Sequence, residues 1–365
     1  LMLANVLHRH GIETTIYELD ASPTARPQGD ILDIHEESGQ LALRKAGLFE
    51  SFRKLVIPAG DNMRILDKTG TVRWTDSGDD TRPEVERGAL RQLLLQSLPD
   101  HCIRWGSKVQ SVARLEEGRH QVTLVSGETF TTSLLIGADG AWSKVRPLLS
   151  DTQPIYSGIS FVETHLLDAS ARYAEVATLV GHGSMFALAD EKGLLTHRDG
   201  NDRITVYIAL KTPEPWTPAD GIDVRDTEAT KRHLLNHFPD WNDQLRALIA
   251  ESETALIPRP IFALPIGHRW ERIPGVTLLG DAAHLMSPFA GEGANLAMLD
   301  GAELAEALLA NPDDVETALA AYETALFPRS EAAASEAQRN LMICFQSDAP
   351  QGMLDLMAQY VAQKG

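Results

Sequence analysis

Apolar and polar positions near the start of the chain predict a helix followed by a strand. Residues 1–10 carry an apolar stripe of helical period, and Gly11 follows where a helix end favours a residue free to adopt positive φ. Residues 14–17 are β-branched and aromatic, which predicts a short strand ending at Glu18. This order is typical of the second half of a dinucleotide-binding βαβ unit, in which the acid binds a ribose. An ordinary helix and strand, with Glu18 as a surface acid, is the alternative.

The first half of such a unit is a strand followed by a glycine-rich turn of the GxGxxG type. No such strand and turn precede residues 1–10 in this sequence. We therefore expect that roughly 25 to 30 residues lie upstream in the natural protein.

Two later apolar runs predict strands of the same nucleotide-binding kind. Residues 133–137 lead into the turn Gly-Ala-Asp-Gly140, and residues 276–279 end on Gly280 and Asp281. Helices are expected at 294–309, where leucines share one side, and at 84–98. Because about 140 residues separate the two strands, we expect another domain to interrupt the nucleotide-binding one.

The interrupting segment, near 155–255, is rich in strand patterns. These patterns cover residues 158–167, 176–188 and 203–210. The last of them alternates as an antiparallel strand with one covered face does. Residues 311–345 predict a long alanine-rich helix, bent or broken near Pro328.

Composition narrows the class of protein. The 365 residues include 33 basic and 51 acidic side chains, for a net charge of −18, so nucleic acid and anionic membranes are disfavoured as partners. The two cysteines exclude a disulfide framework. No apolar run is long enough for a membrane span, and the start lacks the basic region of a signal peptide. We expect a monomer in the cytoplasm.

The segment 280–305 carries the most informative chemistry. A strand brings Asp281 to its carboxyl end, where a carboxylate can bind sugar or ribityl hydroxyls. Gly291 and Gly293 permit close approach of a flat ring, and the following helix offers the partial positive charge of its N-terminus. This arrangement suits the anionic edge of a reduced flavin. A plain glycine-rich turn would explain the glycines, but not Asp281, Pro288 and Asn295 together.

The sequence here resembles the class A FAD-dependent aromatic hydroxylases, and among them most of all the tetracycline destructases. The resemblance runs from residue 1 to about residue 345. It rests on the segments 280–305 and 137–140, on Glu18, and on four shorter matches. Those matches are Gly29-Asp-Ile-Leu-Asp-Ile-His35, Ser38-Gly39-Gln40, Lys45-Ala-Gly-Leu48 and Lys211-Thr-Pro213.

The resemblance implies a set of cofactor-binding residues. Glu18 would bind the adenosine ribose, Asp281 the ribityl chain, and the amides near Gly293 the flavin ring. Asp139 would serve both FAD and the transient nicotinamide nucleotide, although an Asp-Gly turn needs no ligand. Arg87 would contact FAD unless it pairs with Glu84 or Glu86 on its helix. The full set is Glu18, Arg26, Asp33, Arg87, Asp139, Asp281, Pro288, Gly291, Gly293, Ala294 and Asn295.

The implied chemistry needs few protein acids or bases. NADPH, or NADH, would reduce FAD, and one oxygen atom of O2 would pass to an electron-rich carbon, so the cofactor carries the difficult step. We nominate no catalytic nucleophile, and no metal-ligand spacing is evident among the histidines. His284, close to the flavin loop, is expected to be satisfied by backbone groups.

The resemblance also places the substrate, a planar aromatic or polycyclic compound, between the flavin and the inserted sheet. The lining residues would be Glu163, Ser184, Phe186, Thr205, Pro288 and Phe289. Glu163, Ser184 and Thr205 stand where the tetracycline destructases have Gln, Arg and His. Because mismatched polar groups discriminate strongly between substrates, we expect weak or restricted turnover of tetracyclines.

These observations together predict an α/β fold of the para-hydroxybenzoate hydroxylase type. The Rossmann-type FAD-binding domain would comprise residues 1–60, 83–155 and 256–310. The antiparallel-sheet substrate domain would comprise 61–82 and 156–255, with a C-terminal helical segment at 311–365. Two other functions stay open: a flavin-dependent reductase or dehydrogenase of the same fold, and a non-catalytic binder of planar aromatic compounds.

Overall fold

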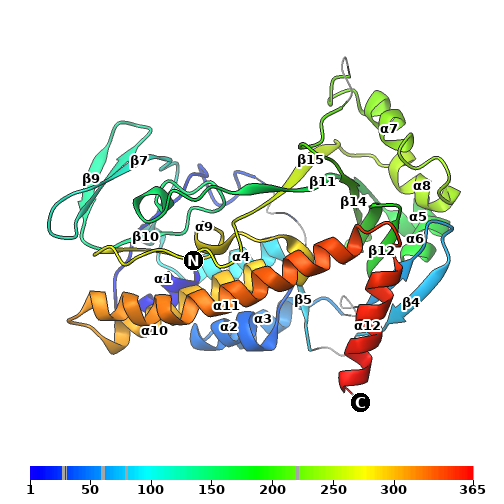
Figure 1. The fold of residues 1–365 in the computed structure, drawn as a ribbon. Coiled ribbons are helices and arrows are strands. Elements are labelled where there is room, and N and C mark those ends of the chain that lie inside the picture. Colours follow the sequence, from blue (N-terminus) through cyan, green and yellow to red (C-terminus); the bar gives the residue numbers. More distant parts are fainter. Residues whose placement is uncertain (27–28, 30, 59–61, 79–80, 219–221, 365) are drawn as a thin grey trace. The chain divides into compact units, whose positions relative to one another are not determined.

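The computed structural model describes residues 1–365 except 27–28, 30, 59–61, 79–80, 219–221 and 365 (Figure 1). Unit 1 comprises Leu1–Val56, Val85–Ile155 and Phe262–Ala337, and unit 2 comprises Ile57–Glu84, Tyr156–Ile261 and Gln338–Gly365. The boundary expected at 60/61, and Asp30 of the segment 29–35, lie outside the described residues. The segment 311–365, expected as a separate part, is divided between the two units after Ala337.

The predicted α/β character of unit 1 is confirmed by two pairs of parallel strands. β1 (Ile16–Tyr17) pairs with β6 (Ile103–Arg104), and β10 (Leu135–Gly137) pairs with β16 (Val276–Leu278). In the second pair, the two apolar runs predicted as strands lie side by side, although about 140 residues separate them in the sequence. The remaining strands are β2 (Ile31–Asp33) with β5 (Glu84–Glu86), and the antiparallel set β7 (Val109–Arg114), β8 (His120–Leu124) and β9 (Thr129–Thr132).

Helices α1 and α10 form the centre of unit 1. α1 (Met2–Arg9) and α10 (Glu292–Ala310) confirm the helices predicted at 1–10 and 294–309. They approach closely because Gly301 has no side chain: a Cβ there would lie 2.8 Å from the backbone nitrogen of Leu3. The other helices are α2 (Leu41–Lys45), α3 (Phe49–Phe52), α4 (Arg87–Gln96), α9 (Asp281–His284) and α11 (Val315–Cys344), with short π or 3-10 turns at Glu36–Gln40, Arg53–Leu55, Asp100–Cys102, Arg146–Leu148 and Pro288–Ala290.

One sequence expectation in this unit is wrong in detail, and another is narrowed. Residues 84–86 form strand β5, and α4 begins only at Arg87. Of the two outcomes expected at Pro328, a bend or a break, the break is excluded, because α11 runs through this residue as one helix. An interior proline costs a helix about 3 kcal/mol, which tertiary contacts on both sides offset. Tyr322 is buried in the core before the proline, and Arg329 pairs with Asp300 and Glu303 after it.

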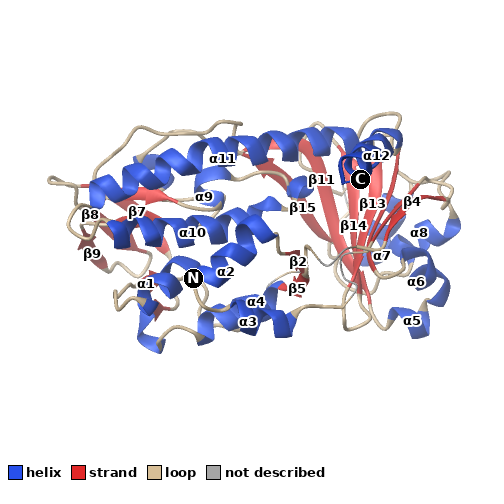
Figure 2. Ribbon diagram, turned by 90° about the horizontal axis from the view of Figure 1, so that it is seen from below, coloured by secondary structure: helices blue, strands red, loops and turns tan. Residues whose placement is uncertain are grey.

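Unit 2 is built on a seven-stranded sheet with the order β15-β11-β14-β13-β12-β3-β4 (Figure 2). β3 pairs with β12 in parallel, and the strand pairs β11–β14, β14–β13, β13–β12 and β3–β4 are antiparallel. The bounds are β3 Met63–Leu66, β4 Val72–Asp76, β11 Ile155–Leu166, β12 Gly183–Ala189, β13 Lys192–Arg198, β14 Ile204–Lys211 and β15 Ile257–Ala263.

One face of this sheet is covered by helices of the same unit. Val162, Met185, Leu194 and Val206 point to that face and share one hydrophobic core with residues of α6, α7 and α8. This confirms the predicted one-sided alternation of residues 203–210, which form β14. The covering helices are α5 (Ala169–Arg172), α6 (Ala174–Val180), α7 (Thr227–Leu235) and α8 (Asp243–Ala250). Unit 2 also contains α12 (Gln351–Lys364), at the end of the chain.

The sequence interpretation of the insert needs two corrections. Residues 174–180 form helix α6, and only Gly183–Ala189 of the expected strand 176–188 is extended. Strand β13, Lys192–Arg198, was not predicted at all. All seven residues of β13 pair with β12 on one side and β14 on the other, so long-range pairing rather than a local period defines this strand.

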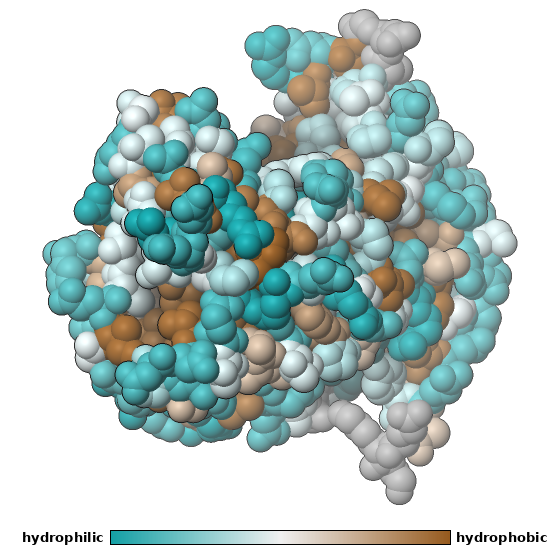
Figure 3. All heavy atoms as spheres, turned by 60° about the vertical axis from the view of Figure 1, so that its left-hand side comes forward, coloured by the Kyte–Doolittle hydropathy of each residue, from teal (hydrophilic) through white to brown (hydrophobic). Residues whose placement is uncertain are grey.

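The drawn face of the molecule is mostly hydrophilic. On the face drawn in Figure 3, hydrophilic residues predominate and hydrophobic ones occur in small groups. Among the described residues, no helix is both long enough and apolar enough to cross a membrane.

Candidate functional site

The loop from β16 to α10 brings the predicted cofactor-binding residues of segment 280–295 to one edge of unit 1. β16 ends at Leu278, Asp281 starts α9, and α10 starts at Glu292 directly after Gly291. Gly291 has φ 68°, and a Cβ there would lie 2.9 Å from an Asp33 carboxylate oxygen. The backbone conformation and the closeness of Asp33 therefore both require glycine at this position.

The first turn of α10 can receive an anionic or electron-rich group. Its first amides have no partner within the helix, and the helix dipole adds partial positive charge. A Cβ at Gly293 would meet no atom within 4 Å, so open space adjoins this turn. Glu292, Gly293 and Ala294 are half-buried. These features fit the edge of a flavin ring, which needs donors and close approach rather than side chains.

Asn295 connects this turn to β2. Its side chain is fully buried, its Oδ1 accepts from the backbone N–H of His35 at 3.0 Å, and its Nδ2 donates to the carbonyls of Asp33 and Gly291, both at 2.9 Å. All three bonds are internal. The side chain of Asn295 thus positions the loop, while a cofactor could contact only its backbone.

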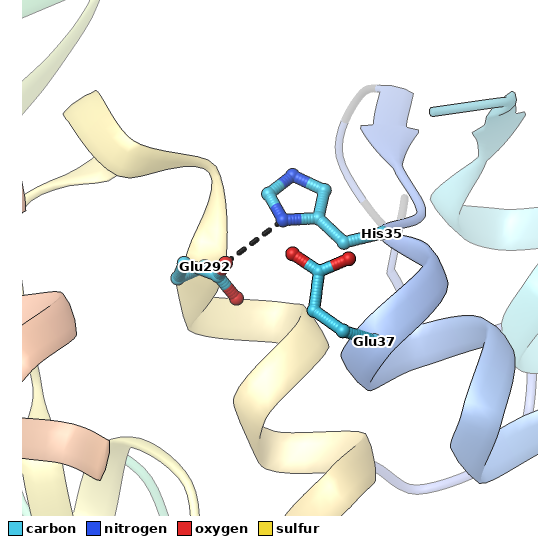
Figure 4. Close-up of side chains that lie close together, drawn as sticks. All are labelled: His35, Glu37 and Glu292. Carbon is cyan, nitrogen blue, oxygen red and sulfur yellow. Dashed lines mark hydrogen bonds and ion pairs between the residues drawn. The ribbon is translucent and has the colours of Figure 1, made fainter. Parts of the chain in front are cut away.

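His35 is held between two carboxylates at the same place. Its Nδ1 lies 2.9 Å from Glu292 Oε1 (Figure 4). Its Nε2 lies 2.8 Å from Asp33 Oδ2, and the ring is buried. A carboxylate only accepts hydrogen bonds. Either both ring nitrogens of His35 carry protons, or one of the two carboxyl groups does. The sequence analysis quoted this histidine only as part of a motif.

His35, Glu37 and Glu292 bring ligand atoms within 4.8 Å of one another, a spacing that a metal ion could use. The sequence predicted no metal. Both ring nitrogens of His35 already face carboxylates, so binding a metal through His35 would displace one of these contacts. We assign no metal to this group.

Asp281 has the environment expected of a ligand-binding carboxylate. Its side chain is exposed to solvent, yet desolvation by the surrounding protein raises the pKa of its carboxyl, while His284 and Arg87 oppose that shift. Asp281 also makes no side-chain hydrogen bond among those found in the described part of the chain.

A buried ion network supports the loop from behind. Asp300 accepts from the backbone N–H of Gly280 at 2.9 Å, and lies 2.7 Å from His284 Nε2 and 2.9 Å from Arg329. Burial favours neutral Asp300, but His284, Gly280 and Arg329 hold its pKa below the usual value. Burial likewise opposes charge on His284, yet Asp300 raises its pKa. The expectation that backbone groups satisfy the His284 side chain is wrong, since its partner is a carboxylate.

The turn after β10 uses Asp139 for its own structure. The carboxylate accepts from the backbone N–H groups of Lys144 at 2.6 Å and Val145 at 3.4 Å, as the turn-forming alternative requires. Arg146, which sequence reasoning passed over, is buried and donates to the carbonyls of Ala282 and Ala141. Burial lowers the pKa of its guanidinium, and Asp139 opposes this.

The remaining predicted cofactor residues lie at the ends of elements. Glu18 follows β1 and accepts from the backbone N–H of Asp20. Arg26 is 64% exposed and pairs with Asp20 at 2.9 Å. Arg87 is exposed at the first position of α4, where it acts electrostatically on Asp281. Sequence reasoning assigned these residues to FAD from the resemblance, and that role stays a prediction.

The four predicted substrate residues of unit 2 share one face of the sheet, opposite the helices. Strand register arranges this face in transverse rows. One row is largely polar and comprises Met63, Ser184, His197, Thr205 and His165. The adjacent row comprises Ile65, Phe186, Leu195, Tyr207 and Glu163. Pro288 and Phe289, the other two predicted residues, lie in the short turn Pro288–Ala290 of unit 1.

The polar row contains a Ser–His–Glu arrangement that sequence reasoning missed. Ser184 Oγ lies 3.0 Å from Nδ1 of His197, whose Nε2 lies 3.1 Å from Glu84. Glu84 was placed in a helix and β13 was not predicted, so neither residue was a candidate. Gly193–Thr196 are all buried, so β13 has no alternation of buried and exposed positions that the sequence could have signalled.

Comparisons with known proteins agree with this geometry. A model of the family described as "FAD binding domain" matches residues 1–337. The chain is 31% identical to monooxygenase asqM of Emericella nidulans, over 97% of this chain and 93% of the relative. It is also 31% identical to monooxygenase penA of Penicillium thymicola, over 94% and 93% respectively.

Solved structures show the same fold at lower identity. HpxO of Klebsiella pneumoniae, in complex with FAD and uric acid, aligns with a TM-score of 0.77 and 20% identity, covering 98% of this chain and 89% of that one. The tetracycline destructase Tet(55) aligns with a TM-score of 0.76 and 18% identity, covering 99% and 92%. The resemblance stated from sequence motifs is confirmed at the level of family and fold.

Proposed function

The chain belongs to the FAD binding domain family and is an FAD-dependent monooxygenase, and from this premise we propose that it hydroxylates a planar phenol or enol. The reductant would be NADPH or NADH, and the oxidant O2. The observation that carries the proposal is the segment 280–295, where an exposed, desolvated carboxylate and the open first turn of α10 follow one parallel strand.

The residues of unit 1 fit FAD in the chemistry of their donors and acceptors. Asp281 would accept from ribityl hydroxyls, Glu18 from a ribose, and the amides of Glu292–Ala294 would stabilise negative charge on the ring. When bound, FAD supplies electron transfer from the nicotinamide and the activation of O2. The protein's part is to bind and orient the ring through the loop that Asn295 and Asp300 support.

The sheet face of unit 2 opposite the helices α5–α8 supports a planar aromatic substrate. Phe186 and Tyr207 are half-buried in one row, and Phe161 contacts Tyr207 with ring centroids 5.4 Å apart. The adjacent polar row offers hydroxyls and imidazoles that can bind a phenol or enol oxygen. A mainly apolar surface with a few polar groups is typical of small-molecule sites.

Within this proposal, turnover of tetracyclines is weak or restricted to some members of the class. The structural neighbour Tet(55) is a tetracycline destructase, but this chain has Glu163 and Ser184 where that family has Gln and Arg. Glu163 is paired with Arg259 at 2.8 Å, so its carboxylate already has a partner on the protein. We infer that the preferred substrate is another planar phenol or enol.

The test is a turnover screen with the FAD-loaded protein. Planar phenols, enols and tetracyclines are incubated with NADPH or NADH, while oxygen uptake, hydrogen peroxide and product mass are measured. We expect at least one phenol or enol to gain the mass of one oxygen atom with coupled nicotinamide oxidation. Nicotinamide oxidation that yields only hydrogen peroxide with every compound would contradict the substrate class proposed.

A further inference from the structure

Three carboxylates surround the buried imidazole of His35 at the first turn of α10. Asp33 lies 2.8 Å from one ring nitrogen, and Glu292 lies 2.9 Å from the other. Side-chain ligand atoms of His35, Glu37 and Glu292 all lie within 4.8 Å of one another, and Figure 4 shows the Glu37 carboxylate beside the other two side chains. These four residues, which we call the carboxylate–imidazole cluster, all belong to unit 1.

The cluster carries more negative charge than its imidazole can balance. Even with both ring nitrogens of His35 protonated, three carboxylates and one imidazolium leave two negative charges. In the described part of the chain, the ion pairs of Asp33 and Glu292 are with His35 alone. Carboxylates that share a site hold a proton more readily than a single carboxylate does, and that proton belongs to the group rather than to one residue.

Glu292 is the member of the cluster at which an added proton can be held. Its Oε1 faces His35, whereas its Oε2 is buried and has no hydrogen-bond partner among the described residues. A buried carboxylate oxygen without a donor is costly, and a proton on that oxygen removes the charge responsible for the cost. Glu37 is exposed, so protons from solvent reach the cluster there.

Glu292 also stands where charge on a flavin ring would act strongly on it. It is the first residue of α10, directly before Gly293, at which a Cβ would meet no atom within 4 Å. A negative charge in that open space would repel the carboxylates of the cluster and favour their protonation. Transfer of a hydride to the ring adds one such charge.

We propose that the carboxylate–imidazole cluster takes up one proton from solvent when the bound flavin is reduced, and that Glu292 holds this proton. The inference rests on the proposed function, because that function places the flavin ring at the first turn of α10. It gives His35 a positioning role. The imidazole holds Oε1 of Glu292, which leaves Oε2 as the atom that gains the proton.

Charge and electrons balance in this step. The nicotinamide nucleotide is oxidised and the ring is reduced by transfer of one hydride, which adds one negative charge to the ring. One proton from solvent forms an O–H bond at Glu292 Oε2 and removes one negative charge, while no bond of the ring changes. The ring and the cluster together therefore keep the net charge that they had before reduction.

The basic side chains of the neighbouring helix α2 are engaged elsewhere. Lys45 pairs with Glu306, and the guanidinium of Arg44 lies 3.6 Å from the centroid of the Phe49 ring. The turn Pro288–Ala290, which leads into α10, has no titratable side chain. Within the described part of unit 1, proton uptake on reduction should therefore depend mainly on the cluster itself.

The proposal is tested by measuring the midpoint potential of bound FAD against pH, with no phenol or enol present. Xanthine and xanthine oxidase reduce the FAD-loaded protein, and a reference dye reports the potential. In the wild type we expect the equilibrium constant for reduction to fall a hundredfold per pH unit, about 60 mV, over part of the range from pH of about 5 to about 8. One factor of ten belongs to the proton that enters the ring, and the other belongs to the cluster.

Glu292→Gln should bind FAD but lose the second factor. Its equilibrium constant should fall only tenfold per pH unit, about 30 mV, throughout the range. Glu37→Gln, at an exposed position, should move the hundredfold range to lower pH, because one of the repelling charges is lost. This variant decides the question by itself if Glu292→Gln does not bind FAD. Glu36→Gln, next to it in the chain and also exposed, is the matched control and should follow the wild type.

The near-ultraviolet spectrum of the reduced protein shows whether the ring itself holds the second proton. We expect the spectrum of anionic reduced flavin wherever the hundredfold dependence holds, and the neutral spectrum there would overturn the proposal. A tenfold dependence throughout in the wild type, or equal curves for the wild type, Glu292→Gln and Glu37→Gln, would overturn it too. With FAD bound and a phenol hydroxylated, these results overturn the role of the cluster alone. A wild type that binds no FAD would overturn the proposed function as well.

Discussion

The Asn295 side chain donates to the backbone carbonyl of Asp33 at 2.9 Å and thereby joins the first turn of α10 to β2 across 262 positions of sequence. Asp33 in turn lies 2.8 Å from His35, which faces Glu292 of the same helix turn. The end of β2 and the start of α10 therefore form one hydrogen-bonded assembly around Gly291, held by the buried amide of Asn295 and by the His35 contacts.

Replacing Asn295 with alanine should destabilise unit 1. The change removes three hydrogen bonds of a fully buried side chain and leaves the N–H of His35 and two carbonyls without this partner, so we expect a loss of about 2–4 kcal/mol. Urea unfolding measures it. Asn311→Ala, which removes one part-exposed bond at the other end of α10, is the control and should cost less than about 1 kcal/mol. Equal costs for the two variants would show that Asn295 has no special structural role.

Asp281→Asn should weaken FAD binding without destabilising the fold. The side chain is exposed, so the free energy of unfolding should change by no more than about 0.5 kcal/mol. Loss of a charged acceptor for ribityl hydroxyls should weaken binding about tenfold or more. Flavin fluorescence titration gives the affinity. Glu271→Gln, at an exposed site of the same unit, should bind FAD as the wild type does, and unchanged affinity in Asp281→Asn would remove it from the cofactor site.

The buried pair of His284 and Asp300 should make stability depend on pH. The pKa of folded His284 is raised, so its contribution is fully present below pH of about 6.5 and is lost as pH rises through the folded pKa. The pKa of folded Asp300 is lowered, so its contribution is present above pH of about 3.9 and is lost as pH falls through the folded pKa.

His284→Gln should therefore cost most in mildly acidic solution. We expect a loss of about 2–3 kcal/mol at pH 5.5, because a buried charge loses its partner, and a smaller loss at pH 9. Urea unfolding at both pH values tests this. His101→Gln changes an exposed histidine of unit 1 and should show no such dependence. A loss that does not vary between the two pH values would mean that His284 is neutral in the folded protein.

Two substitutions on the sheet face should increase turnover of tetracyclines. Glu163→Gln and Ser184→Arg install the residues of the destructases at half-buried positions, and we expect the double variant to gain about tenfold in kcat/KM for tetracycline. Thr205 is left unchanged because it is buried, and a histidine there would overpack the sheet. The assay follows the oxygenated product by mass.

Glu251→Gln, on the exposed end of α8, is the control for that experiment. It changes the net charge of the protein by the same amount as Glu163→Gln does, but it leaves the sheet face unaltered. If the double variant gains nothing, or the control gains as much, then Glu163 and Ser184 do not determine which planar ring system the protein accepts.

The sequence by itself determined the parts of this protein that depend on local signals. The end of β16 at Gly280 and Asp281, the glycine at the start of α10, and the helices α1 and α10 follow from apolar period, turn chemistry and helix-end preferences within about 25 residues. The family and fold were also evident there, because those same short segments carry the resemblance.

Only the tertiary structure decided which distant residues meet. His35 and Glu292 are 257 positions apart, and His197 reaches Glu84 across two separate segments of unit 2. β13 is a strand because β12 and β14 pair with it, and α11 continues through Pro328 because its packing and the Arg329 ion pairs offset the lost hydrogen bond. Such outcomes depend on the summed free energy of long-range contacts, which no local pattern of residues contains.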